Sequence, residues 1–286
     1  MLNNIIDFAP EIPIADWTAE FTEKLTETFS FIFTPIEENF DVFMEFVSES
    51  LYAIPPLIIM IIVALLAFFI TGKKLGLAVF SLVGLWLIYN QGLWEHLMNT
   101  FTLVLISSIL SVIIGVPFGI LMSKSKTAEA IITPILDFMQ TMPAFVYLIP
   151  AVAFFGIGMV PGVFASLIFA TPPTVRFTNL GIRQVSKELV EASEAFGSTG
   201  SQKLFKVELP MAKATIMAGI NQTVMLALSM VVIASMIGAP GLGREVLSAL
   251  QRAQVGTGFV AGVGIVILAI IIDRFTQNVN SKGKKA

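Results

Sequence analysis

Long apolar runs are the feature that most constrains how this chain can fold. Seven stretches of the 286-residue sequence are apolar over about 20 residues, the length that an α-helix needs to cross the hydrocarbon core of a bilayer. Backbone amides inside lipid must be paired within the protein, and the runs are too long for membrane-barrel strands. They therefore predict an all-α, polytopic transmembrane protein with about seven spans. The expected spans are roughly 51–71, 75–94, 97–122, 134–155, 157–175, 214–237 and 255–272.

The composition agrees with this class and excludes others. The sequence is 56% hydrophobic and 13% charged, whereas a soluble domain is about 45–50% apolar. It contains no cysteine, so disulfides and thiolate metal sites are excluded. The single histidine, His96, is expected in a solvated loop beside Glu95. We expect no metal site and no nucleic-acid partner.

The basic residues predict the orientation of the spans. With the connection after the first span in the cytoplasm, 14 of the 17 Lys and Arg residues lie on the cytoplasmic side, and Lys24, Arg244 and Arg252 lie outside. Cytoplasmic segments carry the excess of basic residues, so we expect the N-terminus outside and the C-terminus in the cytoplasm. The cytoplasmic set includes Lys282, Lys284 and Lys285.

Residues 1–50 form an acidic segment ahead of two accessory spans in 51–94. The segment holds eleven Asp and Glu residues and one lysine. Aromatic residues recur at helical spacing from Trp17 to Phe33, which predicts an amphipathic helix on the outer side. Such a helix either lies in the membrane interface or packs on the rim of the protein, and both alternatives stay open. Pro35 is expected to divide it into two helices.

A polar stretch, EASEAFGSTGSQKLFKVELP, interrupts the apolar runs within the loop 176–213. Ser186 is typical of a helix N-cap, and Gly197 is typical of the position just beyond a helix end, where φ becomes positive. A solvated loop with two helix caps is the alternative to a docking element here.

A second short helix is expected after the glycine. Thr199 and Gln202 have the spacing of a capping box, and we expect this helix to end near Leu209 and Pro210, because a residue before proline is disfavoured in the α region. The polar stretch therefore predicts a helix, a sharp turn and a second helix, which is a compact shape suited to docking.

The spacing of this stretch resembles the signature of ABC-importer permeases. The pattern E-A-S, three residues, Gly197, nine residues and V-x-L-P is similar to E-A-A-x3-G-x9-I-x-L-P, with Ser193 and Val207 as mild departures. The segments QTMPAFVYLIP, ATPPTVRFTNLGIRQV and NQTVMLALSMVVIASMIGAPGLG resemble the permeases of glycine betaine/proline importers. The likeness covers roughly residues 92–280.

This resemblance implies a fold, a function and a set of partners. It implies a type I ABC-importer (MetI-like) permease core over residues 95–286, in the bacterial cytoplasmic membrane. The chain would carry glycine betaine/proline-type compatible solutes for osmoprotection. It would act with a second copy of itself, two ATP-binding subunits, an extracellular substrate-binding protein and membrane lipid. The residues implied to couple to the ATPase are Glu191, Ala192, Ser193, Gly197, Leu209 and Pro210.

ATP chemistry is expected outside this chain. The sequence has no G-x-x-x-x-G-K-[ST] phosphate loop, so it predicts no enzyme and no cofactor here, with ATP and Mg bound by the partner subunit. A quaternary ammonium is usually gripped by an aromatic cage, and the three tryptophans do not cluster in the sequence. High-affinity recognition is therefore expected in the separate binding protein. The outer loop 238–254 is its candidate contact, with a plain re-entrant cap as the alternative.

Polar residues inside the expected spans are candidates for lining the solute pathway, because facing lipid is costly. The candidates are Gln140, Met142 and Tyr147 in the fourth span and Asn221, Gln222, Thr223 and Ser229 in the sixth. Pro143 and Pro150 permit local unwinding around the first group. Interhelical contact is the alternative role, and it is the commoner one, because Asn, Gln and Ser often form hydrogen bonds between helices. Gly115-x-x-x-Gly119 and Gly258-x-x-x-Gly262 indicate close helix packing.

Two other functions share parts of this pattern. A permease for an amino acid or methionine would carry the same coupling motif. An ion-driven secondary transporter would need carboxylates at mid-span, whereas Asp137 and Asp273 are expected near cytoplasmic span ends. Asp137 is expected to pair locally.

Overall fold

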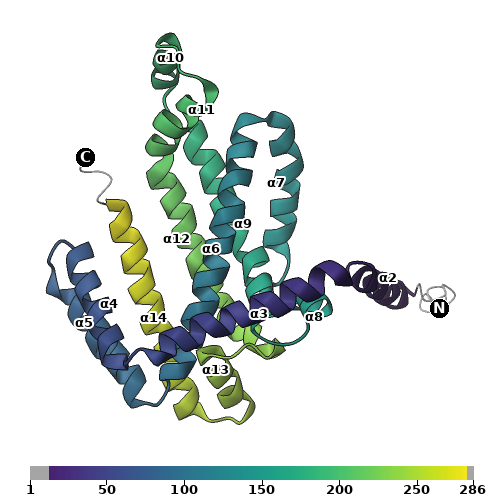
Figure 1. The fold of residues 1–286 in the computed structure, drawn as a ribbon, viewed down its shortest axis with the longest axis vertical. Coiled ribbons are helices and arrows are strands. Elements are labelled where there is room, and N and C mark those ends of the chain that lie inside the picture. The colour runs from purple at the N-terminus through teal and green to yellow at the C-terminus, as the bar shows by residue number, and fades with distance from the viewer. Residues whose placement is uncertain (1–12, 282–286) are drawn as a thin grey trace, which may run out of the picture.

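The computed structural model describes residues 13–281, and this part of the chain is helical almost throughout (Figure 1). Its elements are α2 (Ile14–Thr28), α3 (Ser30–Ala53), α4 (Pro56–Ile70), α5 (Leu75–Asn90), α6 (Trp94–Lys124), α7 (Lys126–Thr141), η1 (Ala144–Tyr147), α8 (Leu148–Phe155), α9 (Met159–Arg183), α10 (Lys187–Ala195), α11 (Gly200–Lys203), η2 (Leu204–Glu208), α12 (Leu209–Ala234), η3 (Ser235–Ile237), α13 (Leu242–Gln251) and α14 (Val255–Ser281). The all-α prediction is confirmed. The start of the acidic segment, together with Lys282, Lys284 and Lys285, lies outside the described residues.

Several of these helices are long and apolar enough to cross a membrane. In the described chain they are Trp94–Lys124, Gly200–Ile237 and Val255–Asn278. The number rises to five if two bent helix pairs each count as one span, namely α3 with α4, bent by 92°, and α7 with η1–α8, bent by 110°. Helix α5 is apolar but has only 16 residues. A polytopic membrane protein is confirmed, and the count of seven spans stays a prediction.

Helices α6, α9 and α12 form the centre of the bundle, and small residues let them approach closely. A Cβ added at Gly119 of α6 would lie 2.5 Å from the Cβ of Thr178 in α9. At Gly115 the added atom would lie 2.8 Å from Thr174 Cγ2. The first glycine pair therefore packs closely, as predicted. In the second pair, Gly258 meets Ala249, whereas an atom added at Gly262 meets nothing within 4 Å.

Buried hydroxyl groups add hydrogen bonds to this packing. Thr174 and Thr223 are 2.7 Å apart at their Oγ1 atoms, and Thr223 also donates to the Ala170 carbonyl at 2.8 Å. Ser111 of α6 donates to the Leu167 carbonyl of α9 at 3.4 Å. In an apolar solvent such bonds hold helices together where the hydrophobic effect between them is weak.

Helix α3 lies across the bundle and contacts α6, α8 and α9 (Figure 1). Met44 is fully buried in this contact, and the rings of Phe33 and Phe154 stack with their centres 4.8 Å apart. This contact favours rim packing for α3. Helix α2 has no buried residue, so the choice between rim packing and the membrane interface stays a prediction there. The opposite face of α3 keeps apolar side chains exposed, among them Phe31 and Phe46.

The break in the acidic segment is at Phe29, so the expectation for Pro35 is wrong. Phe29 leaves the helical region, with φ −104° and ψ 13°, between α2 and α3. Pro35 lies in the second turn of α3. There its missing N–H removes one backbone hydrogen bond without ending the helix.

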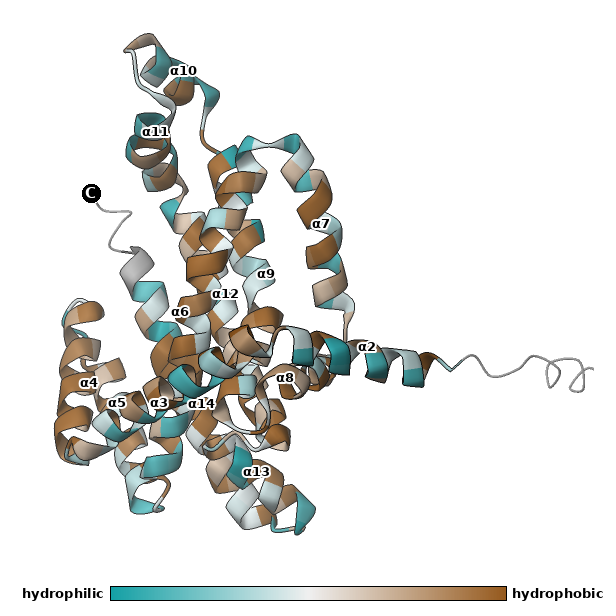
Figure 2. Ribbon diagram, turned by 45° about the vertical axis from the view of Figure 1, so that its right-hand side comes forward, coloured by the Kyte–Doolittle hydropathy of each residue, from teal (hydrophilic) through white to brown (hydrophobic). Residues whose placement is uncertain are grey.

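The two ends of the bundle differ in character. Helices α10 and α11 project at one end, and α13 lies at the other (Figure 1). Figure 2 shows hydrophilic residues gathered on α10 and α11, while α4, α5, α6 and α14 are mostly hydrophobic. We call the projecting element, residues 186–208, the polar hairpin. Arg244 and Arg252, two of the three basic residues expected outside, lie in and just after α13, at the opposite end.

Candidate functional site

The first helix of the polar hairpin has the predicted caps. The Ser186 hydroxyl accepts from the Leu189 N–H at 3.4 Å and starts α10. Gly197 has φ +79°, its N–H donates to the Glu194 carbonyl, and the next N–H, of Ser198, donates to the Ser193 carbonyl. These two bonds form a Schellman motif, which turns the chain sharply at a residue that favours glycine.

The second helix of the hairpin begins as predicted. The Thr199 hydroxyl accepts from the Gln202 N–H, and the Gln202 side chain accepts from the Thr199 N–H, which completes the capping box. Lys203 then pairs with Glu194 across the turn. This ion pair fastens α11 to α10, so the hairpin is a compact unit.

The expected end of this helix near Leu209 and Pro210 is wrong. The chain stays helical from Gly200 to Ile237, through the π-helical turn η2 and into α12. The Leu209 N–H bonds to the Leu204 carbonyl, five residues back. Pro210 has no N–H to donate and crowds the preceding carbonyls. The widened turn just before it accommodates the proline without ending the helix.

The tip of the hairpin presents an apolar side chain among polar ones. Phe196, immediately before Gly197, is 92% exposed. Glu191 and Ala192 are exposed as well, and Ser193 is half-buried, with its hydroxyl bonded to the Val190 carbonyl. A Cβ added at Gly197 would meet nothing within 4 Å in this chain. Sequence reasoning did not predict a role for Phe196, although an aromatic residue in a polar turn can indicate a docking surface.

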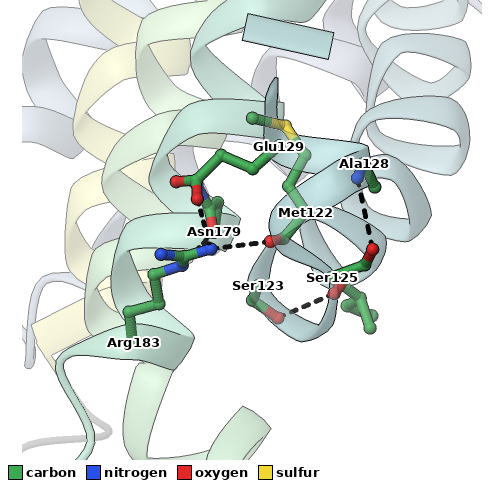
Figure 3. Close-up of polar contacts among 8 residues, drawn as sticks. Met122, Ser123, Ser125, Ala128, Glu129, Asn179 and Arg183 are labelled. Carbon is green, nitrogen blue, oxygen red and sulfur yellow. Dashed lines mark hydrogen bonds and ion pairs between the residues drawn. The ribbon is translucent and has the colours of Figure 1, made fainter. Parts of the chain in front are cut away.

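The first foot of the hairpin, at the end of α9, is bonded to the turn between α6 and α7 (Figure 3). Arg183 Nη2 donates to Glu129 Oε2 at 2.6 Å and to the Met122 carbonyl at 2.9 Å. Arg183 Nε also donates to Asn179 Oδ1 at 2.9 Å, and Asn179 donates to Glu129. The Met122 carbonyl is one of the last in α6, where helical acceptors lack donors. The arginine therefore caps the end of α6 and at the same time forms an ion pair with α7.

The second foot, at the π-turn, is bonded to the same turn. Lys124, the last residue of α6, pairs with Glu208. The Glu208 side chain is 7% exposed, and that of Lys124 is 39% exposed. A buried carboxylate needs such a partner, because its desolvation is costly. Sequence reasoning missed this pair, since nothing local links positions 84 residues apart.

The pathway candidates of the fourth span lie at its break. Helix α7 ends at Thr141, the chain bends at Met142 and Pro143, and η1 follows. The unwinding expected at Pro143 is therefore present. Tyr147 is buried and donates its hydroxyl to the Met139 carbonyl. Gln140 is exposed and Met142 is half-buried. Their pathway role stays a prediction, and Tyr147 here has a structural bond.

The candidates of the sixth span, in α12, divide between two faces. Asn221 faces α14, where it donates to Asp273 at 3.0 Å and accepts from Thr276. This is the interhelical alternative, and the buried Thr223, bonded to Thr174 of α9, takes the same role. Gln222 and Ser229 are exposed and seven residues apart, which places them on one face of the helix. That face is open in this chain, and its role as pathway lining stays a prediction.

Three polar or charged residues, Asp137, His96 and Thr100, have partners in other helices. Asp137 pairs with Arg176 between α7 and α9. His96 is in the first turn of α6, so its placement in a loop is wrong, and its Nε2 lies 3.5 Å from Glu245 of α13. Thr100 accepts from the Leu242 N–H at 2.8 Å, one turn further along α6. Helix α13 therefore contacts the first turns of α6 through both residues.

A family model of binding-protein-dependent transport system inner membrane components matches residues 111–285. The chain belongs to this family. The match runs from the middle of α6 through α14, so it includes the polar hairpin and both of its feet.

Relatives extend the likeness over nearly the whole chain. The glycine betaine/carnitine transport permease protein GbuB of Listeria monocytogenes is 57% identical, over 96% of this chain and 98% of that protein. The glycine betaine transport system permease protein OpuAB of Bacillus subtilis is 53% identical over 98% of both. The permease protein ProW of Escherichia coli is 48% identical over 94% of this chain and 75% of its own length. At this coverage the matches include α3, α4 and α5, which the family model leaves out.

Solved structures support the fold of the core. A chain of the inward-facing MetNI methionine ABC transporter superposes with a TM-score of 0.61 at 20% identity, over 67% of this chain and 95% of that chain. An amino acid ABC transporter chain gives 0.54 at 20% identity. At this identity the likeness shows the fold alone, and it confirms the MetI-like core. Helices α2 to α5 lie ahead of the residues that the family model matches, and their separate role stays a prediction.

Proposed function

We propose that this permease is the membrane subunit of an ATP-driven importer for glycine betaine and related methylated-ammonium zwitterions. The observation that carries the proposal is the identity of 57% and 53% over almost the whole chain to permeases named for glycine betaine transport. The relatives are named for glycine betaine, carnitine and proline betaine, which share a quaternary ammonium and a carboxylate. Import of such a solute would serve osmoprotection.

The polar hairpin is the dock for the ATP-binding subunit in this proposal. Phe196 supplies an apolar anchor at the tip, and the open space over Gly197 lets a partner surface approach closely. Glu191 and Ala192 lie exposed on α10 beside them. ATP and Mg are bound by the partner, and this chain hydrolyses none. Two copies of the permease pair with two ATP-binding subunits.

The orientation follows from the dock. The hairpin end faces the cytoplasm, where ATP is available, and the α13 end faces outside, where a solute-loaded binding protein arrives. The distribution of Lys and Arg supports this assignment. Helix α13 and the loop around it, with Arg244 and Arg252, form the proposed contact for the binding protein.

A continuous helix joins the dock to the far end of the bundle. The 38 residues from Gly200 to Ile237 are about 57 Å long at the usual helical rise. When nucleotide draws the two ATP-binding subunits together, the hairpins move and the helix carries the displacement towards α13. Solute arrival is coupled to ATP hydrolysis if this helix has two stable arrangements and if events at both of its ends favour one of them.

Reconstitution tests the proposal. The permease with its ATP-binding and solute-binding partners is placed in proteoliposomes, and uptake of labelled glycine betaine is measured with ATP on the hairpin side. We expect uptake that needs ATP and the binding protein, that excess carnitine or proline betaine reduces, and that methionine leaves unchanged. Inhibition by methionine alone would replace the proposed solute class with the alternative one.

A further inference from the structure

Both feet of the polar hairpin are fastened to the same short segment, the turn between α6 and α7 at residues 122–129. Arg183 at the first foot bonds to Met122 and Glu129, and Glu208 at the second foot pairs with Lys124. We propose that these contacts form a permanent clamp, which makes the α6–α7 turn and α7 follow the hairpin during transport. Arg183 and Glu208 are then positioning residues of the transport cycle. The inference rests on the proposed function, since it assumes that the hairpin is driven by an ATPase.

Burial shows that the second contact is a built feature. The Glu208 carboxylate is 7% exposed, and it lies in the π-turn that joins the hairpin to α12. Lys124 approaches it from the end of α6, where a cation is also favoured by the helix dipole. Removing the lysine would leave this carboxylate buried without a compensating charge, which is costly. The pair therefore ties the two segments together in a way that an exposed pair does not.

The first contact uses two kinds of acceptor. Arg183 donates to a carboxylate of α7 and to a backbone carbonyl of α6, so a single guanidinium holds both sides of the turn (Figure 3). Its planar group of five donors suits such a fork, and lysine would lose that geometry. The turn is thus held from both sides, by a cation at the first foot and an anion at the second.

Helix α7 is the element that the clamp controls. In α7, which is fully described, Leu136 is the single buried residue, and Ile131, Ile135 and Phe138 are all more than half exposed. At its far end the chain bends by 110° at Met142 and Pro143. A helix with so little burial, clamped at one end, tied to α9 by an ion pair further along and bent at the other end, moves with the clamp and with α9. The displacement then reaches Gln140 and Met142, which are pathway candidates.

Charge exchange tests the clamp. We measure solute uptake and ATP hydrolysis for Glu208→Gln, for Glu208→Lys with Lys124→Glu, and for the control Glu20→Gln, which breaks the exposed Lys24–Glu20 pair of α2. We expect Glu208→Gln to retain the ATP-binding subunit and its hydrolysis while uptake per ATP falls about tenfold, within the range of allosteric couplings. The charge exchange should restore part of the loss, and the control should match the wild type. Normal uptake per ATP in Glu208→Gln would overturn the clamp.

A covalent tether distinguishes a clamp from a contact that opens and closes. The chain has no cysteine, so Lys124→Cys with Glu208→Cys can be joined specifically by a short thiol cross-linker. We expect uptake to be low before cross-linking and to recover after it, because the two segments move together. Loss of uptake in the tethered protein would overturn the proposal, since it would mean that the pair must separate.

Co-purification separates this inference from the proposed function. If wild-type permease does not retain the ATP-binding subunit, and Gly197→Leu changes nothing, the proposed dock fails. If the wild type retains the subunit and Glu208→Gln imports normally, the dock stands and the clamp fails.

Discussion

The Tyr147 hydroxyl donates to the Met139 carbonyl, the helical acceptor whose donor would be the N–H that Pro143 lacks. A residue eight positions further along the chain thus completes the end of α7. The phenol replaces the missing backbone donor, which explains how the chain can bend sharply there without leaving this part-buried carbonyl unpaired. The bend and the tyrosine form one structural unit.

Removing this hydroxyl should destabilise the bend. We expect Tyr147→Phe to lower the free energy of unfolding by about 1 kcal/mol, the net contribution of a typical hydrogen bond. Thermal unfolding in detergent measures it. The control is Tyr52→Phe, because Tyr52 is 54% exposed and should lose little. Equal effects of the two substitutions would contradict the role given to Tyr147.

Close packing of α6 on α9 should make Gly119 intolerant of any side chain. We expect Gly119→Ala to destabilise by about 1–3 kcal/mol, because its Cβ would lie 2.5 Å from the Cβ of Thr178. Gly262→Ala is the matched control in another span, where the added atom meets nothing within 4 Å. The difference in melting temperature between the two variants measures the clash. If Gly262→Ala were as unstable as Gly119→Ala, the loss of a glycine, and not the clash, would explain the destabilisation.

The turn of the polar hairpin should depend on glycine for two separable reasons. Gly197→Leu should abolish co-purification of the ATP-binding subunit and solute uptake, since a Cβ at φ +79° costs about 1–2 kcal/mol and the side chain fills the docking space. Asparagine tolerates this conformation, so Gly197→Asn should bind the ATP-binding subunit better than Gly197→Leu does. Binding of the ATP-binding subunit to both variants is measured in detergent. Unchanged uptake in Gly197→Leu would remove the coupling role.

Phe196 should behave as an anchor of the docking interface. We expect Phe196→Ala to weaken binding of the ATP-binding subunit by about 2 kcal/mol or more, roughly 30-fold in affinity. Phe21→Ala is the control, because that side chain is 67% exposed on α2, away from the hairpin. Titration of the subunit onto immobilised permease compares them. Equal affinities of the two variants would show that the tip of the hairpin is not part of the docking interface.

Engineered cysteines should report the orientation. In the cysteine-free chain, Ser201→Cys should react with an impermeant thiol reagent only after cells are opened, and Gln251→Cys should react in intact cells. The reason is that α11 and the end of α13 lie at opposite ends of the bundle. The reverse pattern would invert the topology.

Local signals in the sequence predicted the hairpin well, because its caps depend on neighbouring residues. Ser186, the Thr199–Gln202 box and the positive φ of Gly197 all involve groups within a few positions of one another. Pro210 shows where such signals fail. A proline favours a helix end, but here a single π-turn precedes it and the helix continues into α12.

The sequence by itself determined that the chain is a helical membrane protein, where its polar hairpin lies and which residues shape the turn. Apolar run length and capping chemistry are properties of neighbouring residues, so they can be read along the chain. Only the tertiary structure decided that α3 lies across the bundle, that Tyr147 completes α7, and that Lys124 meets Glu208. These contacts join positions whose proximity is set by the packing of whole helices. Glu208 shows the difference. The polar stretch around it predicts a solvated carboxylate, but the side chain is buried, and it needs the lysine at the end of another helix as a partner.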